Sequence, residues 1–371
     1  IFYFLSLALT QIITTDTWWN LSDGRFFFET WKAPAVDPYS YVTEGRPWVD
    51  GFWFSGVLLY PIFKLGGGFL LVITQVIVIG LVFLLLSRIR KRYTPGVILP
   101  SLVFTMLMAS PRFQVRAELF ALLSQAIFFY LIYKYQYEGE SVRIGKKTFP
   151  LAAAFVLTMI FWVNVHPSFV MGIFILSIFL MGELTSAFLV RLGISNPEPR
   201  PISGRRYFKL VGIYISATAA TAINPYGIKI WSIPFFFWKN HDFVAKNINE
   251  WMPLDLYWLR FVDRPFVAVL FLVLVLGILG ILANWRKTSI SWAALWICSI
   301  FMFDSSVRHV SFYAMVSYPV LVLNWSGLIV GHEQKRWIRQ WGAIAIAVFM
   351  MIIVFDRVTE RSIVQHAKYE A

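Results

Sequence analysis

The sequence has few charged residues and almost no cysteine. Only 14% of its 371 residues are charged, whereas 58% are hydrophobic and 18% are aromatic. Soluble domains carry about 25% charged residues, so much of this surface cannot face water. The one cysteine, Cys298, lies in an apolar stretch and can form no internal disulfide, so it gives no information on the redox compartment.

Signatures of several enzyme classes are also missing. The sequence has no Gly-rich loop that could hold a nucleotide phosphate, no Cys or His pair with zinc spacing and no serine-nucleophile turn. Residues 66–68, all glycine, are interpreted as a helix entry. We therefore expect no nucleotide or redox cofactor. Because there is neither a fixed-period repeat nor a domain-length linker, residues 1–371 are predicted to form a single transmembrane domain.

Hydrophobic runs alternate with polar loops along the whole chain. A helix needs about 20 apolar residues to cross the bilayer core. Runs near this length, some of them shorter, predict membrane spans near residues 1–14, 68–87, 96–110, 117–133, 149–165, 169–190, 207–223, 265–284, 289–303, 309–330 and 342–356. The expected fold is all-α, a polytopic transmembrane bundle of about ten or eleven helices. The first run is interpreted as a trimmed helix and not as a signal peptide, because it has no basic leader and no cleavage site.

Lysine and arginine concentrate in every second loop and produce the net charge of +13. Short basic loops of membrane proteins stay in the cytoplasm, which predicts a cytoplasmic N-terminus. The remaining segments are then placed outside, namely residues 15–67, 111–116, 166–168, 224–264 and 304–308. Since membrane topology accounts for the positive charge, we expect membrane lipid as a partner and no nucleic acid.

The first outer loop begins at a helix end with Thr15-Asp16-Thr17-Trp18-Trp19 and is expected to carry short amphipathic helices. An acid at the membrane boundary, flanked by aromatic rings that exclude water, could act as a general base on a hydroxyl acceptor. Alternatively, Asp16 caps the helix that follows it. Trp18, Trp19 and Trp48 are expected to roof a site below this loop.

Three outer arginines are candidate phosphate ligands. Arg112 and Arg116 are four residues apart, so both forks could reach phosphate oxygens from one helical face, or both side chains could snorkel to lipid headgroups. Arg308 could bind phosphate as well, or could pair with Asp304 at helical i, i+4 spacing.

Two further outer residues could take part in chemistry. His166 lies in a tight break between two spans and is either a proton carrier, a metal ligand or a satisfied interhelical histidine. Glu250 precedes Trp251 and is either a second acid of the site or a solvated loop charge. Asp16, His166 and Glu250 could converge on a divalent metal ion. We expect Asp16 and at least two of the arginines to line one cavity, because charges at low dielectric need partners.

Six motifs in the outer segments carry a family resemblance. They are Asp16 to Gly24, Asp37 to Tyr41, Pro47-Trp48, Asn164 to His166, Asn224 to Gly227 and Glu250 to Pro253. This pattern, over roughly residues 10–310, resembles the GT-C superfamily of membrane glycosyltransferases, which includes oligosaccharyltransferase catalytic subunits, protein O-mannosyltransferases and lipid A aminoarabinose transferases. It is most similar to a set of poorly characterised bacterial GT-C-like proteins.

The resemblance implies a GT-C-like fold in a bacterial cytoplasmic membrane, with the site on the outer face. Asp16 would be the catalytic acid, and outer arginines would bind the phosphate of a polyprenyl-phosphate sugar whose sugar moves to an acceptor. Two departures favour an alternative, a non-catalytic scaffold subunit of a membrane complex: Thr17 stands where many members have a second acid, and the sequence shows no C-terminal soluble domain. A third interpretation is a secondary transporter, which would need polar residues near the middle of the membrane in two matching halves of the chain. Glu183 lies within an apolar run, but the sequence shows no pairing of halves.

Overall fold

The computed structural model describes residues 7–9, 12, 14–90, 95–144, 147–254 and 264–330. The predicted spans near 1–14 and 342–356 lie mostly or wholly outside these residues. Each of the predicted spans between these two overlaps one α-helix. These helices are α3 (Trp53–Ser87), α4 (Pro95–Ala109), α5 (Glu118–Tyr137), α6 (Leu151–Val165), α7 (Val170–Arg191), α8 (Gly204–Ala220), α12 (Arg264–Ala283), α13 (Ile290–Ser305) and α14 (Val310–Val330).

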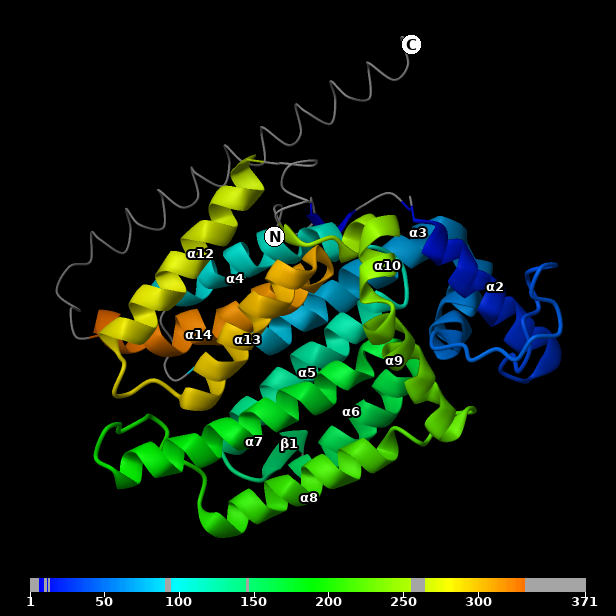
Figure 1. The fold of residues 1–371 in the computed structure, drawn as a ribbon. Helices are drawn as coiled ribbons and strands as arrows, with labels where there is room; N and C mark the ends of the chain where they lie inside the picture. The colour runs from blue at the N-terminus through cyan, green and yellow to red at the C-terminus, as the bar shows by residue number, and fades with distance from the viewer. Residues whose placement is uncertain are drawn as a thin grey trace.

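The helices pack as a bundle, which confirms the expected polytopic helical membrane fold (Figure 1). Within the described residues, three helical stretches are long and apolar enough to cross a membrane by themselves: Trp53–Ser87, Pro167–Arg191 and Phe266–Ala283. Helix α14 contacts α4, α12 and α13, while α5 contacts α3 and α6. The core holds large side chains without exposed surface, among them Trp162 and Phe179. The chain is an integral membrane protein.

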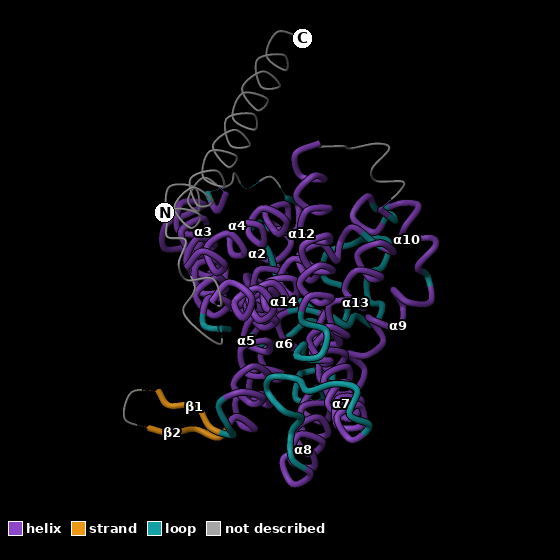
Figure 2. The backbone as a smooth tube through the Cα atoms, turned by 90° about the vertical axis from the view of Figure 1, so that its left-hand side faces the viewer, coloured by secondary structure: helices purple, strands orange, loops and turns teal. Residues whose placement is uncertain are grey.

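The connections between helices separate into two kinds. At one end of the bundle, the turns are short 3₁₀ segments and helices: η1 (Ser110–Arg112), η2 (Pro167–Phe169), η3 (Gly227–Trp231), α9 (Ser232–Lys239), α10 (His241–Asn247), η4 (Asn249–Trp251) and η5 (Val307–His309). These are the segments predicted to lie outside. The alternating connections carry the basic loops. Figures 1 and 2 show α9 and α10 at the end of the bundle away from the α7–α8 connection.

One connection contains strands that the sequence did not predict. Strands β1 (Ser141–Ile144) and β2 (Lys147–Pro150) form an antiparallel hairpin between α5 and α6 (Figure 2). In the sequence this segment stood out only as a basic loop, since four-residue strands are too short to show an alternating pattern. Gly139, with φ of 128°, allows the chain to leave α5 toward this hairpin.

The first outer loop is mostly helical. In its first helix the polar side chains are buried and aromatic side chains are exposed, the reverse of an ordinary amphipathic helix. Helix α2 (Thr15–Thr30) buries a polar face with Thr17, Asn20 and Asp23, while Trp18 is 52% exposed. This inversion fits a helix whose polar side faces the protein and whose aromatic rings face the membrane interface. Helix α3 also begins earlier than expected, at Trp53, and its break at Gly67, with φ of 59° and ψ of −151°, requires glycine.

Helices α2 and α3 approach each other through Gly24. A Cβ at Gly24 would lie 2.2 Å from the carbonyl oxygen of Gly56 and 2.5 Å from the Cβ of Tyr60, and neither atom can move independently of its helix. The absence of a side chain at Gly24 therefore sets the position of α2, and with it the position of Asp16.

Replacing Gly24 by alanine is expected to destabilise the protein by about 1–3 kcal/mol, the usual cost of forcing atoms into a packed contact. Gly212→Ala, inside α8 where nothing lies within 4 Å of the added Cβ, should be neutral or slightly stabilising. Thermal unfolding of both variants in detergent measures the difference. Equal melting temperatures would show that the α2–α3 contact can relax.

Candidate functional site

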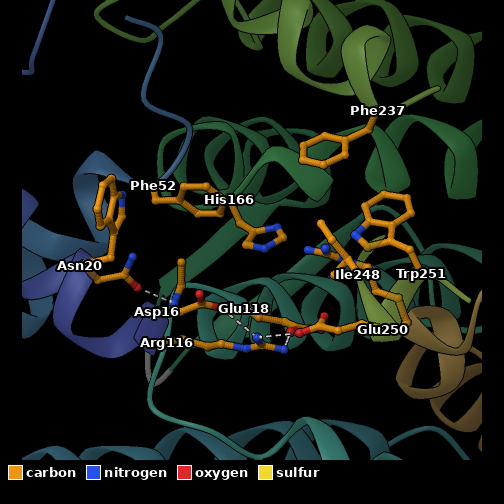
Figure 3. A pocket seen from close by; sticks show the side chains of 13 residues that line it. Asp16, Asn20, Phe52, Arg116, Glu118, His166, Phe237, Ile248, Glu250 and Trp251 are labelled. Carbon is orange, nitrogen blue, oxygen red and sulfur yellow. Dashed lines mark hydrogen bonds and ion pairs between the residues drawn. The ribbon is translucent and has the colours of Figure 1, made fainter. Parts of the chain in front are cut away.

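The segments predicted to lie outside meet at one cavity of about 230 Å³. Side chains from five separate segments line it (Figure 3): Asp16, Trp19, Asn20, Phe52, Arg116, Ala117, Glu118, His166, Phe237, Ile248, Glu250, Trp251 and Arg308. The sequence placed six of these residues in the site: Asp16, Trp19, Arg116, His166, Glu250 and Arg308. The expected convergence of Asp16 with at least two arginines is present.

The polar face of α2 anchors the arginine-bearing segment. The hydroxyl of Thr17 donates to the carbonyl of Val115, and Asn20 Oδ1 accepts a hydrogen bond of 2.8 Å from the backbone N–H of Ala117. Both bonds are buried. They hold the chain next to Arg116 against α2, so that Asp16 and Arg116 meet although they are 100 residues apart.

Hydrogen bonds join the other segments to one another. Trp53 Nε1 donates to Asn164 Oδ1 at 3.2 Å, and Asn164 Nδ2 donates to the carbonyl of Ile223 at 2.8 Å. The fourth and fifth segments are connected by Ser306, whose hydroxyl donates to the carbonyl of Glu250 at 3.2 Å. These bonds fix the relative positions of turns that carry the charged side chains.

Two buried arginines and two glutamates form an ionic cluster at the cavity, in which Arg116, Glu118 and Glu250 line the wall and Arg112 lies behind it. Arg112 Nε donates to Glu118 Oε1 at 2.9 Å, and Arg112 Nη1 donates to Glu250 Oε2 at 2.8 Å. Arg112 is 7% exposed and Glu118 is 8% exposed. Burial raises the pKa of Glu250, but the charges of Arg112 and Arg116 outweigh it, so the net shift is downward and Glu250 is ionised at neutral pH.

Arg116 connects this cluster to the cavity. Its Nη1 donates to Asp16 Oδ2 at 2.8 Å and to Glu250 Oε1 at 3.1 Å, while its Nη2 donates to Glu118 Oε2 at 2.5 Å. The Oδ1 of Asp16 has no hydrogen-bond partner among the described residues, and the Asp16 side chain is 56% exposed. Arg116 thus holds Asp16 through Oδ2, while Oδ1 remains available to accept a hydrogen bond from a ligand.

The structure contradicts three of the alternative interpretations that the sequence allowed for these residues. Thr14, not Asp16, caps α2, because the Thr14 side chain accepts from the backbone N–H of Asp16 at 3.3 Å. Arg112 and Arg116 do not snorkel to lipid, since both are buried and paired with carboxylates. Within the described residues, Arg308 forms no ion pair with Asp304.

Arg308 lines the cavity and is half-buried. Unlike Arg116, it has no carboxylate partner within the described part of the chain. Its guanidinium carbon lies 4.8 Å from the centre of the Trp251 ring, a cation–π contact. The Trp251 ring also stacks on Phe237, with centres 5.0 Å apart. Burial is the largest influence on the pKa of Arg308 and lowers it from its ordinary value. A cation in this position would gain from an anionic ligand.

His166 is neutral and caps its own turn. Burial and the nearby charge of Arg308 lower the pKa of His166 to about 3. The Nδ1 atom accepts from the backbone N–H of Ser168 at 3.0 Å and lies 2.8 Å from the Ser168 hydroxyl oxygen. Since a neutral imidazole carries one proton, that proton is on Nε2, which makes His166 a hydrogen-bond donor at the cavity.

Three predicted residues lie outside the cavity wall. Arg112 stands behind it, paired with Glu118 and Glu250, and Trp18 packs instead against Phe63, with ring centres 6.0 Å apart. Of the three expected roof residues, only Trp19 lines the cavity; neither Trp18 nor Trp48 is among its lining residues. Trp18 and Trp19 point apart because neighbouring residues of a helix face different directions.

Other lining residues were not predicted from the sequence. Asn20 lies one helical turn after Asp16, so helical spacing could have indicated it. Glu118 follows Arg116 by two residues, a spacing that does not predict a shared helix face. Phe237 gave no signal, because it is one of three consecutive phenylalanines and only the packing of α9 selects it. Among the described residues, no three His, Cys, Asp or Glu side chains are grouped so that they could hold a metal ion.

A second pair of acids is buried next to the site. Asp23 and Asp50 are 1% and 2% exposed, and each has one carboxylate oxygen without a hydrogen-bond partner among the described residues. Burial and the neighbouring Asp50 raise the pKa of Asp23 to about 8, although Tyr39 donates to it at 2.8 Å. Burial also raises the pKa of Asp50 to about 6. Folding therefore shifts both groups toward the protonated form.

This pair predicts a loss of stability with rising pH. A carboxyl whose pKa is raised on folding stabilises the native state below its unfolded pKa of about 4, and this contribution disappears as the pH rises through the folded value. For Asp23 the window is from about pH 4 to 8, with a slope of at most about 1.4 kcal/mol per pH unit.

Asp23→Asn is therefore expected to unfold at a higher temperature than the parent protein at pH 8, with the difference shrinking toward pH 5. Thermal unfolding at a series of pH values measures this. Asp242→Asn, at a side chain that is 96% exposed, is the matched control and should follow the parent curve. Parallel curves for Asp23→Asn and the parent would contradict the shifted pKa.

The arrangement of helices is that of a GT-C-type membrane fold. The chain is similar to the crystal structure of the Archaeoglobus fulgidus oligosaccharyltransferase tethered to an acceptor peptide, with a TM-score of 0.55 and 14% sequence identity. The match covers 95% of this chain and 52% of that one, so the chain spans about half the length of the solved protein. No protein-family model matches the sequence, and no curated protein is similar to it at a significant level.

Proposed function

We propose that this protein is a glycosyltransferase that moves a sugar from a polyprenyl-phosphate donor to an acceptor on the non-cytoplasmic face of a membrane. The observation that carries the proposal is one cavity holding both Asp16, with a free carboxylate oxygen, and Arg308, a cation without a carboxylate partner among the described residues. The GT-C-type fold, which the chain shares with an oligosaccharyltransferase, supports it. The alternation of basic loops with the segments that form the site supports the outer face.

The reaction would be an inverting transfer. The acceptor hydroxyl gives its proton to Asp16 as its oxygen forms a bond to the anomeric carbon of the sugar. The bond between that carbon and the phosphate oxygen breaks, and the electron pair leaves with the lipid phosphate. Arg308 would stabilise the charge that develops on this phosphate, and the Nε2 proton of His166 could donate to an oxygen of the donor.

Arg308→Gln is expected to weaken binding of a polyprenyl phosphate by about tenfold to a hundredfold, because a hydrogen bond to a charged group is worth about 1.5–3 kcal/mol. Native mass spectrometry of the purified protein titrated with the lipid measures this binding. Arg286→Gln is the matched control, since Arg286 also lies over a tryptophan, Trp285, at 5.0 Å, but in the connection after α12 at the opposite end of the bundle.

Equal lipid affinity of Arg308→Gln and the parent protein would contradict the assignment of the phosphate site. If the protein is instead a scaffold subunit, we expect no binding of polyprenyl phosphate by either the parent protein or Arg308→Gln. A protein that purifies in a stable complex with a larger membrane assembly, and that binds no polyprenyl phosphate, would favour the scaffold.

A further inference from the structure

Arg116 occupies the point at which the two accessible acids of the cavity converge. A single nitrogen, Nη1, donates to Asp16 Oδ2 at 2.8 Å and to Glu250 Oε1 at 3.1 Å (Figure 3). Asp16 lies 100 residues before Arg116 in the sequence, and Glu250 lies 134 residues after it. Two carboxylates repel each other at short range unless a cation lies between them. In many acidic sites that cation is a divalent metal ion. Here it is a guanidinium group from the chain itself.

The charges of the site are balanced without a metal ion. In their ionised forms, Asp16, Glu118 and Glu250 carry three negative charges, and the arginines that pair with them or face the same cavity, Arg112, Arg116 and Arg308, carry three positive charges. Before a phosphate-bearing donor binds, a divalent cation placed among these groups would leave an excess charge of two in a partly buried site. Such an excess is costly because water and counterions screen it poorly there.

His166 is not available as a metal ligand in its present hydrogen bonding. Its Nδ1 lone pair accepts the Ser168 backbone N–H at 3.0 Å, and the proton of the neutral ring is therefore on Nε2. Neither nitrogen has a free lone pair to offer to a cation. The residues of the cavity thus do not fit the divalent metal site that Asp16, His166 and Glu250 suggested in the sequence.

We propose that Arg116 takes the place of a divalent metal ion in this site, bridging Asp16 and Glu250 and orienting Asp16, so that the protein acts without a metal. This inference deepens the proposed function and rests on it only for the role of Asp16 as base. Arg116 is a positioning residue: it holds Oδ2 and leaves Oδ1 to accept the proton. Glu118, bonded to Nη2 of the same guanidinium at 2.5 Å, holds Arg116 in this orientation.

Manganese binding tests the proposal without any glycosyl transfer. The probe is Mn²⁺ alone, detected by electron paramagnetic resonance of the purified full chain in detergent. The parent protein is expected to show no saturable binding at millimolar Mn²⁺. Removing the guanidinium with Arg116→Met leaves converging carboxylates, so this variant should bind Mn²⁺ and should gain a melting temperature that rises with Mn²⁺ concentration.

Two further variants make the result specific. Arg116→Met combined with Asp16→Asn should lose the acquired Mn²⁺ binding. Arg25→Met removes an arginine from an exposed pair with Glu29 in the same helix and should bind no Mn²⁺. Saturable Mn²⁺ binding by the parent protein that Asp16→Asn abolishes would overturn the proposal. So would a folded Arg116→Met variant that binds no Mn²⁺.

If Arg116→Met does not fold, experiments on the parent protein alone still test whether the site uses a metal ion. Absence of Mn²⁺ binding, together with transfer activity that a chelator does not change, supports the proposal, whereas activity that a chelator abolishes and Mn²⁺ restores overturns it. A failure of the proposed function is recognised separately, because it would remove transfer and lipid binding but leave the Mn²⁺ titrations of the parent and its variants unchanged.

Discussion

Replacing Asp16 by asparagine is expected to lower the rate of sugar transfer by about 10²–10⁴-fold, the usual contribution of a positioned general base. Asparagine has nearly the same shape, and its side-chain oxygen can still accept from Arg116 Nη1, which lies 2.8 Å from Oδ2 in the parent protein. It cannot take a proton from the acceptor hydroxyl. The loss should therefore appear in kcat, while the melting temperature and the affinity for polyprenyl phosphate change little.

The assay compares transfer from a polyprenyl-phosphate sugar by purified parent protein and variants at saturating donor. Asp304→Asn is the matched control, because Asp304 is an exposed acid in the fifth outer segment and does not line the cavity. It should keep the activity of the parent. Near-normal turnover by Asp16→Asn, with Asp304→Asn also active, would show that Asp16 does not accept the proton.

The second large effect is expected on stability, from Glu118. This carboxylate is 8% exposed and pairs with both Arg112 and Arg116. Glu118→Gln removes its charge and leaves the two guanidinium groups short of one negative partner in a buried cluster. Breaking a buried ion pair in this way costs about 3–5 kcal/mol. Because Arg116 would also lose its orientation, transfer activity should fall together with stability.

Glu29→Gln provides the comparison, since Glu29 belongs to an Arg–Glu pair in the same part of the protein with side chains that are 67% and 59% exposed. Exposed pairs of this kind contribute about 0–1 kcal/mol, because water screens the charges. Thermal unfolding in detergent distinguishes the two variants. A melting temperature of Glu118→Gln equal to that of Glu29→Gln would mean that water or another acid compensates the arginines.

The helical membrane fold could be predicted from the sequence with good accuracy. Membrane helices must satisfy all their backbone hydrogen bonds internally, so each span is a continuous apolar run of sufficient length. For this reason the expected span at residues 149–165 and the helix Leu151–Val165 nearly coincide. The helical start of α3 at Trp53 was missed because its first turns combine apolar and polar residues, and the hairpin at 141–150 was missed because it is short.

The candidate site was predictable in part. Charged side chains stand out in an apolar sequence, and their placement in alternate loops indicated that Asp16, Arg116, His166, Glu250 and Arg308 lie at one end of the bundle. Their pairing was not predictable. Arg112 and Arg116 were candidate phosphate ligands, with snorkelling as the alternative, and in the structure each is bonded to carboxylates. The roles of all these residues in binding and catalysis remain predictions.

The sequence by itself determined that the chain is a helical membrane protein and which segments lie at the same end, because hydrophobicity and loop charge are local properties that the bilayer acts on directly. Only the tertiary structure decided which charges meet. Arg116 finds Asp16 100 residues before it and Glu250 134 residues after it, and nothing in their local sequence specifies this contact. The partners are selected by the close approach of α2 and α3 at Gly24 and by the polar face of α2, since a buried charge is stable only where the packing of distant helices supplies its counterion.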